Sequence, residues 1–93
     1  MLGLVLAVAA AHAMAYPGES LARDARIDIR TARDIAMKAR PGRITGQELE
    51  KEPGGSGLRY AFDIKDGSKI YEVGVDAMTG KVLENAPEKP HAD

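Results

Sequence analysis

The sequence LRYAFDIKDGSKIYEVGVDAMTG, residues 58–80, has the pattern of two strands joined by a tight turn. Asp66-Gly67 is a strong hairpin signal. Apolar residues alternate with polar or small ones on both sides of it, which is the period of a half-buried strand. They are Leu58, Tyr60, Phe62 and Ile64 before the turn, and Tyr71, Val73 and Val75 after it. We therefore predict an antiparallel hairpin with one apolar face, followed by a turn at residues 76–80.

The segment before the hairpin has the pattern of one amphipathic helix. Asp28 suits the N-cap, because its carboxylate can accept a hydrogen bond from a free amide of the first turn. Pro41 disfavours helical geometry at Arg40, and Gly42 suits the exit from the helix. We place the helix at about residues 29–40. Its apolar residues fall on one face: Ile29, Ala32, Ile35, Ala36 and Ala39.

These elements predict an α+β fold in which a single helix packs on one face of a small antiparallel sheet of three to four strands. The expected order is helix-strand-strand-strand. A weaker strand over residues 43–52 ends in Glu-Lys-Glu, which suits a charged edge strand, and Val82-Leu83 forms a short last strand. The helix stripe then covers the apolar face of the hairpin. We expect the other face to be largely solvated, with Arg59, Asp63, Lys65, Glu72 and Asp76 among Ala61, Ile70 and Gly74.

Residues 1–15 have the pattern of an export signal. The run from Leu2 to Ala11 is almost wholly apolar and leads into small-x-small sites that suit a signal peptidase. We predict cleavage between Ala15 and Tyr16 and a periplasmic or secreted protein. The run is shorter than the roughly 20 apolar residues that span a bilayer, so we expect no stable membrane insertion after cleavage. A buried N-terminal helix and an uncleaved anchor remain alternatives, and the absence of Lys or Arg before Leu2 indicates an upstream start codon or an atypical signal.

The rest of the chain divides into three parts. Residues 16–26 are polar and begin with Pro-Gly, so we expect a flexible lead-in. Residues 27–84 form the domain. Residues 85–93 are polar and rich in proline, and we expect a disordered tail.

The composition excludes several function classes. With 13 Lys+Arg against 14 Asp+Glu, the chain lacks the basic excess of a nucleic-acid binder. It has no Cys, which excludes disulfides and cysteine zinc sites. His12 and His91 both lie outside the predicted domain, so no histidine is placed to activate a Ser or Thr nucleophile. We expect no enzyme, no cofactor and no metal.

Three pieces of this sequence together resemble the PepSY domain: IDIRTARDIAMKARPG, the YxFxI strand, and YEVxVDAxTGKVL. The resemblance runs from about Ile27 to Glu84. It implies a helix on an antiparallel sheet, an exported or cell-envelope protein, and a role in inhibiting or restraining peptidases, without catalytic residues. We expect the matching residues to be structural: Ala36, Pro41, Gly42, Tyr60, Phe62, Tyr71, Val73, Asp76 and Gly80. In particular, Asp76 suits a turn cap and Gly80 a positive φ.

The functional expectation is a non-enzymatic exported interaction module that binds and restrains an envelope or extracellular peptidase. An edge strand such as residues 43–52 could pair with the partner's backbone. The alternative is a periplasmic ligand- or sensor-binding module that associates with an envelope signalling or transport protein. One sheet face stays open in either case, so weak homodimerisation is a reasonable expectation.

Overall fold

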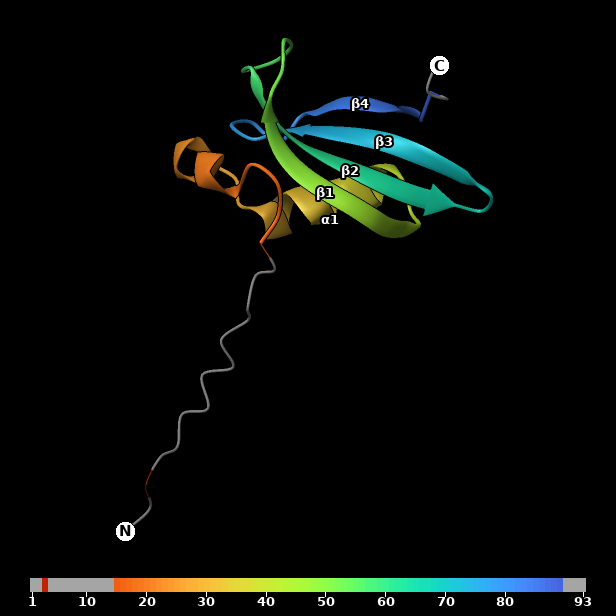
Figure 1. Ribbon diagram of the computed structural model, residues 1–93, viewed down its shortest axis with the longest axis horizontal. Helices are drawn as coiled ribbons and strands as arrows, with labels where there is room; N and C mark the ends of the chain where they lie inside the picture. The colour runs from red at the N-terminus through yellow and green to blue at the C-terminus, as the bar shows by residue number, and fades with distance from the viewer. Residues whose placement is uncertain (1–2, 4–14, 90–93) are drawn as a thin grey trace.

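The computed structural model defines residue 3 and residues 15–89 (Figure 1). Its four strands form one antiparallel sheet in the order β1-β2-β3-β4. One α-helix lies across one face of this sheet, so the predicted α+β class is confirmed. The elements are the 3₁₀ helix η1 (Glu19–Asp24), α1 (Ile29–Ala39), β1 (Arg43–Lys51), β2 (Leu58–Asp66), β3 (Lys69–Asp76) and β4 (Val82–Pro87).

Helix α1 begins and ends where its capping residues predict. Asp28 accepts a hydrogen bond from the Thr31 amide at 2.8 Å, which satisfies one free donor of the first turn. The Arg40 amide donates to the Ala36 carbonyl at 2.8 Å, and the helix ends there, one residue before Pro41. The two residues buried on the sheet side are both alanines, Ala32 and Ala36. Their small side chains let the helix backbone approach the sheet closely.

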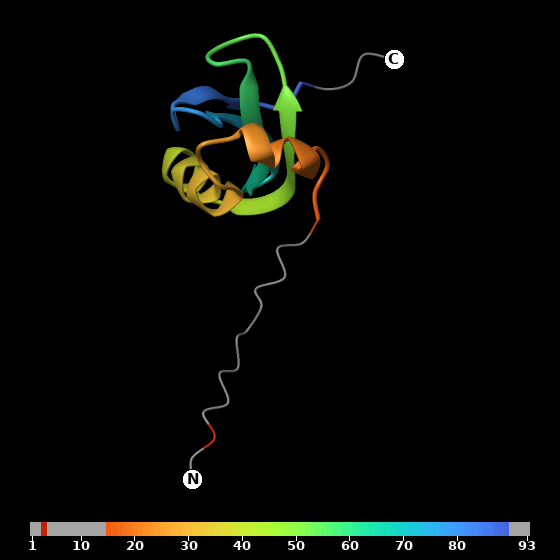
Figure 2. The same ribbon diagram turned by 90° about the vertical axis from the view of Figure 1, so that its left-hand side faces the viewer.

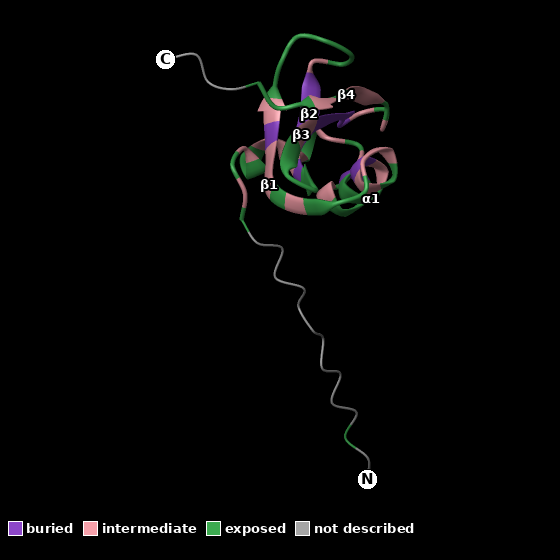
Figure 3. Cartoon of the chain, turned by 90° about the vertical axis from the view of Figure 1, so that its right-hand side faces the viewer, coloured by how far each residue is buried: buried purple, intermediate pink, exposed green. Residues whose placement is uncertain are grey.

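The core lies between α1 and the two central strands (Figure 3). Phe62 of β2 pairs with Val73 of β3, and Tyr60 pairs with Val75, so all four project from the same face. None is more than 1% exposed. The predicted apolar face is therefore confirmed. Tyr71 lies at its rim, where the Arg40 guanidinium stacks 3.7 Å from the centre of its ring.

The segment at residues 16–26 is not a flexible lead-in but is packed on the domain (Figure 2). Helix η1 lies beside β1, and the Leu49 amide donates to the Pro17 carbonyl at 2.9 Å. Gly18 has a φ of 83° and lies against Leu49, where a Cβ would overlap the Leu49 carbonyl. The prediction failed because this segment has few apolar residues among its charges, and their partners are distant in sequence.

The last strand is also longer than Val82-Leu83. Strand β4 continues through Pro87, with Ala86 opposite Glu72. The Asn85 side chain donates to the Ala39 carbonyl and accepts from Arg40 Nε, both at 3.2 Å, which ties β4 to the end of α1. The prediction that a disordered tail begins at residue 85 is therefore wrong, because the strand continues to Pro87. Residues 90–93, like residues 1–2 and 4–14, lie outside the described residues.

Asp76 ends β3 and joins two loops through its buried carboxylate. Oδ2 accepts from the Ser56 amide at 2.7 Å. Oδ1 accepts from the Ser56 hydroxyl and the Met78 amide, both at 2.8 Å, and from the Thr79 amide at 3.2 Å. Burial raises the pKa of Asp76, but these hydrogen bonds outweigh it and lower the pKa to about 2. The turn closes at Gly80, whose φ is 79°, as predicted.

We predict that Asp76→Asn destabilises the domain by about 2–4 kcal/mol at pH 7, because an amide NH₂ would face donors that now meet a carboxylate. Urea unfolding measures the loss. The exposed Asp66→Asn is the control and should cost less than about 1 kcal/mol. The folded pKa of Asp76 is depressed, so its contribution is complete above the ordinary value of 3.8 and is lost as the pH falls through about 2. Equal stability of the two variants would contradict this role.

Candidate functional site

The two edge strands of the sheet differ in how much of their backbone is free. On β1, the Leu49 amide points away from β2 and donates to Pro17, so the N-terminal segment covers the middle of this edge. The register also shifts between Ile44 and Gly46, and such a bulge hinders pairing with another strand. The edge proposed from the sequence, residues 43–52, is thus partly occupied.

The outer edge of β4 is free. The Glu88 amide donates to the Ile70 carbonyl at 2.8 Å, which marks these residues as a hydrogen-bonded pair of the β3–β4 ladder. Such pairs alternate with non-bonded ones in an antiparallel ladder. The backbone of Ala86 therefore faces β3, whereas the N–H and C=O of Asn85 face outwards. Within residues 15–89, no backbone group pairs with β4 on that side, and Pro87, which has no N–H, closes its far end.

The sheet face turned away from α1 is rich in carboxylates. Alternation along the paired strands places these side chains opposite to the core residues. We call this surface the open face. Its small central residues are Ala61 and Gly74, its basic residues are Arg59 and Lys65, and Asp76 lies buried at one end. Its other acidic residues are Glu48, Glu50, Glu52, Asp63, Glu72, Glu84 and Glu88.

Arg59 of β2 lies opposite Asp76, and the Arg59 side chain reaches over Gly74 and covers part of the open face, which corrects the prediction of a largely solvated face. Its side chain is 8% exposed. The guanidinium lies over Gly74, where a Cβ would come within 3.3 Å of Nη1. Nη1 binds Glu84 at 3.4 Å, and Nη2 donates to the Pro53 carbonyl at 3.2 Å. The position of Arg59 could not be predicted from the sequence, because that position depends on the β1–β2 loop and on β4.

The carboxylates of the open face repel one another. Burial raises the pKa of Glu50 to about 7, aided by a hydrogen bond with Glu52 and by the charges of Glu48, Glu52 and Glu72. Burial also raises the pKa of Glu72, with added repulsion from Glu84 and other carboxylates. The field of this face is therefore negative and only partly neutralised by its two basic residues.

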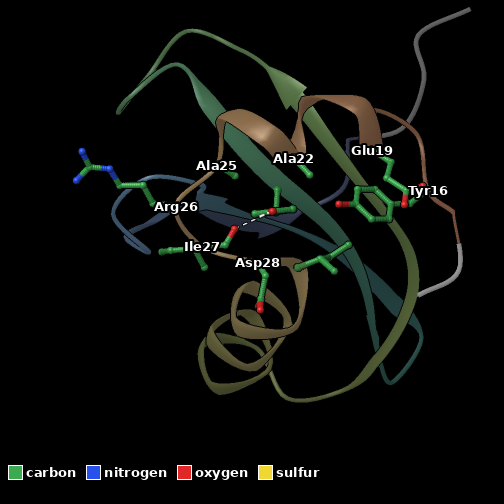
Figure 4. A pocket seen from close by; sticks show the side chains of 9 residues that line it. Tyr16, Glu19, Ala22, Ala25, Arg26, Ile27 and Asp28 are labelled. Carbon is green, nitrogen blue, oxygen red and sulfur yellow. Dashed lines mark hydrogen bonds between the residues drawn. The ribbon is translucent and has the colours of Figure 1, made fainter. Parts of the chain in front are cut away.

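A third surface is a cleft between η1 and the start of α1 (Figure 4). Its volume is about 260 Å³. Tyr16 lies on one side of it, and the Tyr60 hydroxyl donates to the Ile27 carbonyl at 2.7 Å. Burial raises the pKa of Tyr60 to about 12, with a further contribution from Tyr16. The Tyr60 phenol is thus a neutral structural donor, and the cleft contains no evident nucleophile.

The residues of the PepSY resemblance do not form one site. Ala36, Tyr60, Phe62 and Val73 are buried in the core, and Tyr71 lies at its rim. Pro41 and Gly42 are exposed at the exit of α1, where a Cβ on Gly42 would lie 2.5 Å from the Lys65 carbonyl. Asp76 and Gly80 shape the β3–β4 turn. Ala15 is exposed and Tyr16 half-buried beside η1. That the matching residues have structural roles stays a prediction.

Among the residues that the structure describes, no group of three or more His, Asp or Glu side chains is arranged to hold a metal ion. None of the helices in this part of the chain has the length and apolar character needed to cross a membrane.

We predict that the domain becomes less stable as the pH rises from about 5 to 8. The pKa of Glu50 in the folded state, about 7, exceeds its ordinary value of 4.5, so its favourable contribution is complete below 4.5 and is lost as the pH rises through about 7. Glu72 acts in the same direction. Urea unfolding at pH 5.5 and pH 8 measures the difference. Glu50→Gln should remove much of it and stabilise the protein at pH 8, whereas Glu19→Gln should not. A pH dependence that is unchanged in Glu50→Gln would refute the assignment.

One comparison with known proteins gives a result. The family model described as the peptidase propeptide and YPEB domain, PepSY, matches residues 26–85. No curated protein and no solved structure matches the chain. The matched residues run from just before α1 into β4 and include the whole sheet except the end of β4. Since the match covers well over half of the 93 residues, the chain belongs to the PepSY family.

Proposed function

We propose that this PepSY domain is a non-catalytic, exported module that binds a peptidase and restrains it. The family description, a peptidase propeptide domain, supplies the class of partner. The free outer edge of β4 offers a backbone to which the partner can bind. This edge is the observation on which the proposal rests.

The binding mode follows from the backbone of β4. A strand whose outer N–H and C=O groups are free can accept another extended strand, and the new backbone hydrogen bonds supply affinity. Asn85 offers one N–H and one C=O for this purpose. Its side chain is held by Ala39 and Arg40, so the strand is fixed before the partner arrives. A pre-ordered edge of this kind loses little conformational entropy on binding.

Restraint without reaction fits the chemistry of the described residues. They include no His and no Cys, the side chains that most often act as base or nucleophile. Asp76 is saturated with hydrogen bonds and ionised, and the Tyr60 phenol is committed to Ile27. The proposal therefore requires only occlusion of the peptidase cleft by a folded domain.

Export is supported by the position of the proposed cleavage. The apolar run ends near Ala15, and Tyr16 is the first of residues 15–89 that packs on the core. Cleavage between them would leave intact the contacts of Tyr16, Pro17 and η1 with β1 and the core. PepSY domains also occur in exported proteins. The mature chain would then begin at the first of residues 15–89 that contacts the core.

We predict that the chain beginning at Tyr16 inhibits at least one peptidase purified from the envelope or secreted fraction of the native cells. Residual peptidase activity against a protein substrate measures the effect. Asn85→Pro should weaken inhibition about tenfold or more, because it removes the outward N–H and places a bulky ring on the edge. Asn85→Ala is the matched control. It loses the same side-chain bonds to Ala39 and Arg40 but keeps the N–H, so it should inhibit clearly better than the proline variant.

Thermal unfolding of both variants establishes that they are folded at the assay temperature. Equal inhibition by the proline and alanine variants would show that β4 is not the pairing strand. Failure to inhibit any peptidase of these fractions would overturn the proposal. Specific recovery of a sensor kinase or transporter instead would favour the alternative, a ligand- or sensor-binding module.

A further inference from the structure

The end of α1 lies beside the free edge of β4 and carries positive charge. Helix α1 contacts β4, and the Asn85 side chain ties the end of the helix to this strand. Residues 35–47, which include the end of the helix, contain Lys38, Arg40 and Arg43 and no carboxylate. The side of the β4 edge that faces α1 is therefore bordered by a cationic segment.

Arg40 is the basic residue of this segment that contacts Asn85, and three groups hold its guanidinium. Nε donates to Asn85 Oδ1 at 3.2 Å, and Nη1 pairs with Asp66 Oδ2 at 3.4 Å. The guanidinium carbon lies 3.7 Å from the centre of the Tyr71 ring. These contacts fix the orientation of the Arg40 side chain before any partner binds, which reduces the conformational entropy lost on binding.

The Arg40 guanidinium still has free donors and charge that is only partly neutralised. Within residues 15–89, no hydrogen bond or ion pair involves Nη2. The Arg40 side chain is 28% exposed and that of Asp66 is 49% exposed, so solvent screens this ion pair. In a guanidinium, the Nε proton and one Nη2 proton project from the same edge. Since Nε points to Asn85, the free Nη2 donor projects on the side of Asn85.

A strand that adds to β4 places one of its side chains next to this guanidinium. Directly opposed residues of an antiparallel pair project from the same face, with their Cβ atoms about 5 Å apart. The Asn85 side chain projects towards α1, so the partner residue opposite Asn85 projects towards α1 as well. A carboxylate at that position of the partner reaches an arginine that already contacts Asn85.

We propose that Arg40 is a specificity-determining residue, which selects a strand that carries an aspartate or glutamate opposite Asn85. The inference rests on the proposed function, because it names the side chain that the peptidase strand presents to β4. The carboxylate accepts a hydrogen bond from Nη2 and supplies the negative charge that the exposed Asp66 supplies only in part. Charge-assisted hydrogen bonds of this kind are stronger than neutral ones.

The other face of β4 determines on which side the acidic residue must lie. Alternation along β4 places Glu84 and Glu88 on the open face. An acidic side chain of the added strand is repelled by these carboxylates on the open face and attracted by Arg40 on the α1 side. Because a shift of one residue moves every side chain to the other face, this difference favours one register of the added strand.

The test measures the binding of three synthetic peptides to the full chain by NMR chemical-shift titration, which detects weak binding. Each peptide has seven residues, alternates threonine and valine, and carries glutamate, glutamine or lysine at its centre. We expect the glutamate peptide to bind about fivefold more tightly than the glutamine peptide, and the lysine peptide to bind most weakly. The Asn85 amide signal should shift, and Asn85→Pro should abolish the binding of all three peptides.

The decisive quantity is the ratio of the dissociation constants of the glutamine and glutamate peptides. Arg40→Gln should reduce this ratio from about five to about one, because it removes the charge that the carboxylate meets. The variant also loses the contacts with Asp66 and Tyr71, but damage to β4 would weaken both peptides alike and leave the ratio unchanged. Arg30→Gln, at the exposed start of α1, is the matched control and should keep the ratio near five.

A ratio that is the same in Arg40→Gln and the wild type would overturn the inference. Absence of binding by the glutamate peptide, or binding that survives Asn85→Pro, would also overturn it. An equal fall of the ratio in Arg30→Gln would show attraction by net charge alone, with the same consequence. Failure of the proposed function is a separate result, because inhibition of a peptidase is measured without these peptides.

Discussion

The fold depends on one buried carboxylate, that of Asp76. Burying a charge is costly unless its hydrogen bonds are replaced, and here Ser56, Met78 and Thr79 replace them. The next residue continues the junction. The Ala77 amide donates to the Leu58 carbonyl, and the Ala77 carbonyl accepts from the amides of Arg26 and Ile27, just before α1. The β1–β2 loop, the β3–β4 turn and the N-terminal segment therefore meet at one point. The position of the helix over the sheet follows from that junction.

This junction also explains why the two sheet faces have such different character. The face towards α1 holds the buried apolar core. The loop that Asp76 fixes through Ser56 includes Pro53, whose carbonyl accepts from Arg59. Arg59 is thereby held flat against the open face, and the carboxylates around it are brought together. The acidic surface thus depends on the same hydrogen-bonded junction at Asp76 that closes the core, although the surface and the core consist of different types of side chain.

The sequence predicts the features that depend on local periodicity. It does not predict the features that depend on contacts between distant segments. Two-residue alternation identified Tyr60 and Phe62 as core residues, and capping chemistry placed both ends of α1 correctly. Asp76 was also recognised as a turn cap from the residues that follow it. By contrast, the sequence does not predict η1, because its few apolar residues find their partners in β1 and the core. Nor does any local pattern show that β4 and a glycine-rich loop enclose Arg59, so the sequence predicts a solvated side chain there. The free edge of β4, which carries the proposed interaction, belongs to this second kind of feature.

The open face is unfavourable for the isolated domain. Glu50 has a pKa near neutrality only because its ionised form is destabilised by burial and by its neighbours, so the folded protein loses stability by ionising it at pH 7 and above. A small domain without disulfides has little stability to spare. Glutamine at the same positions would keep the strands and remove the repulsion.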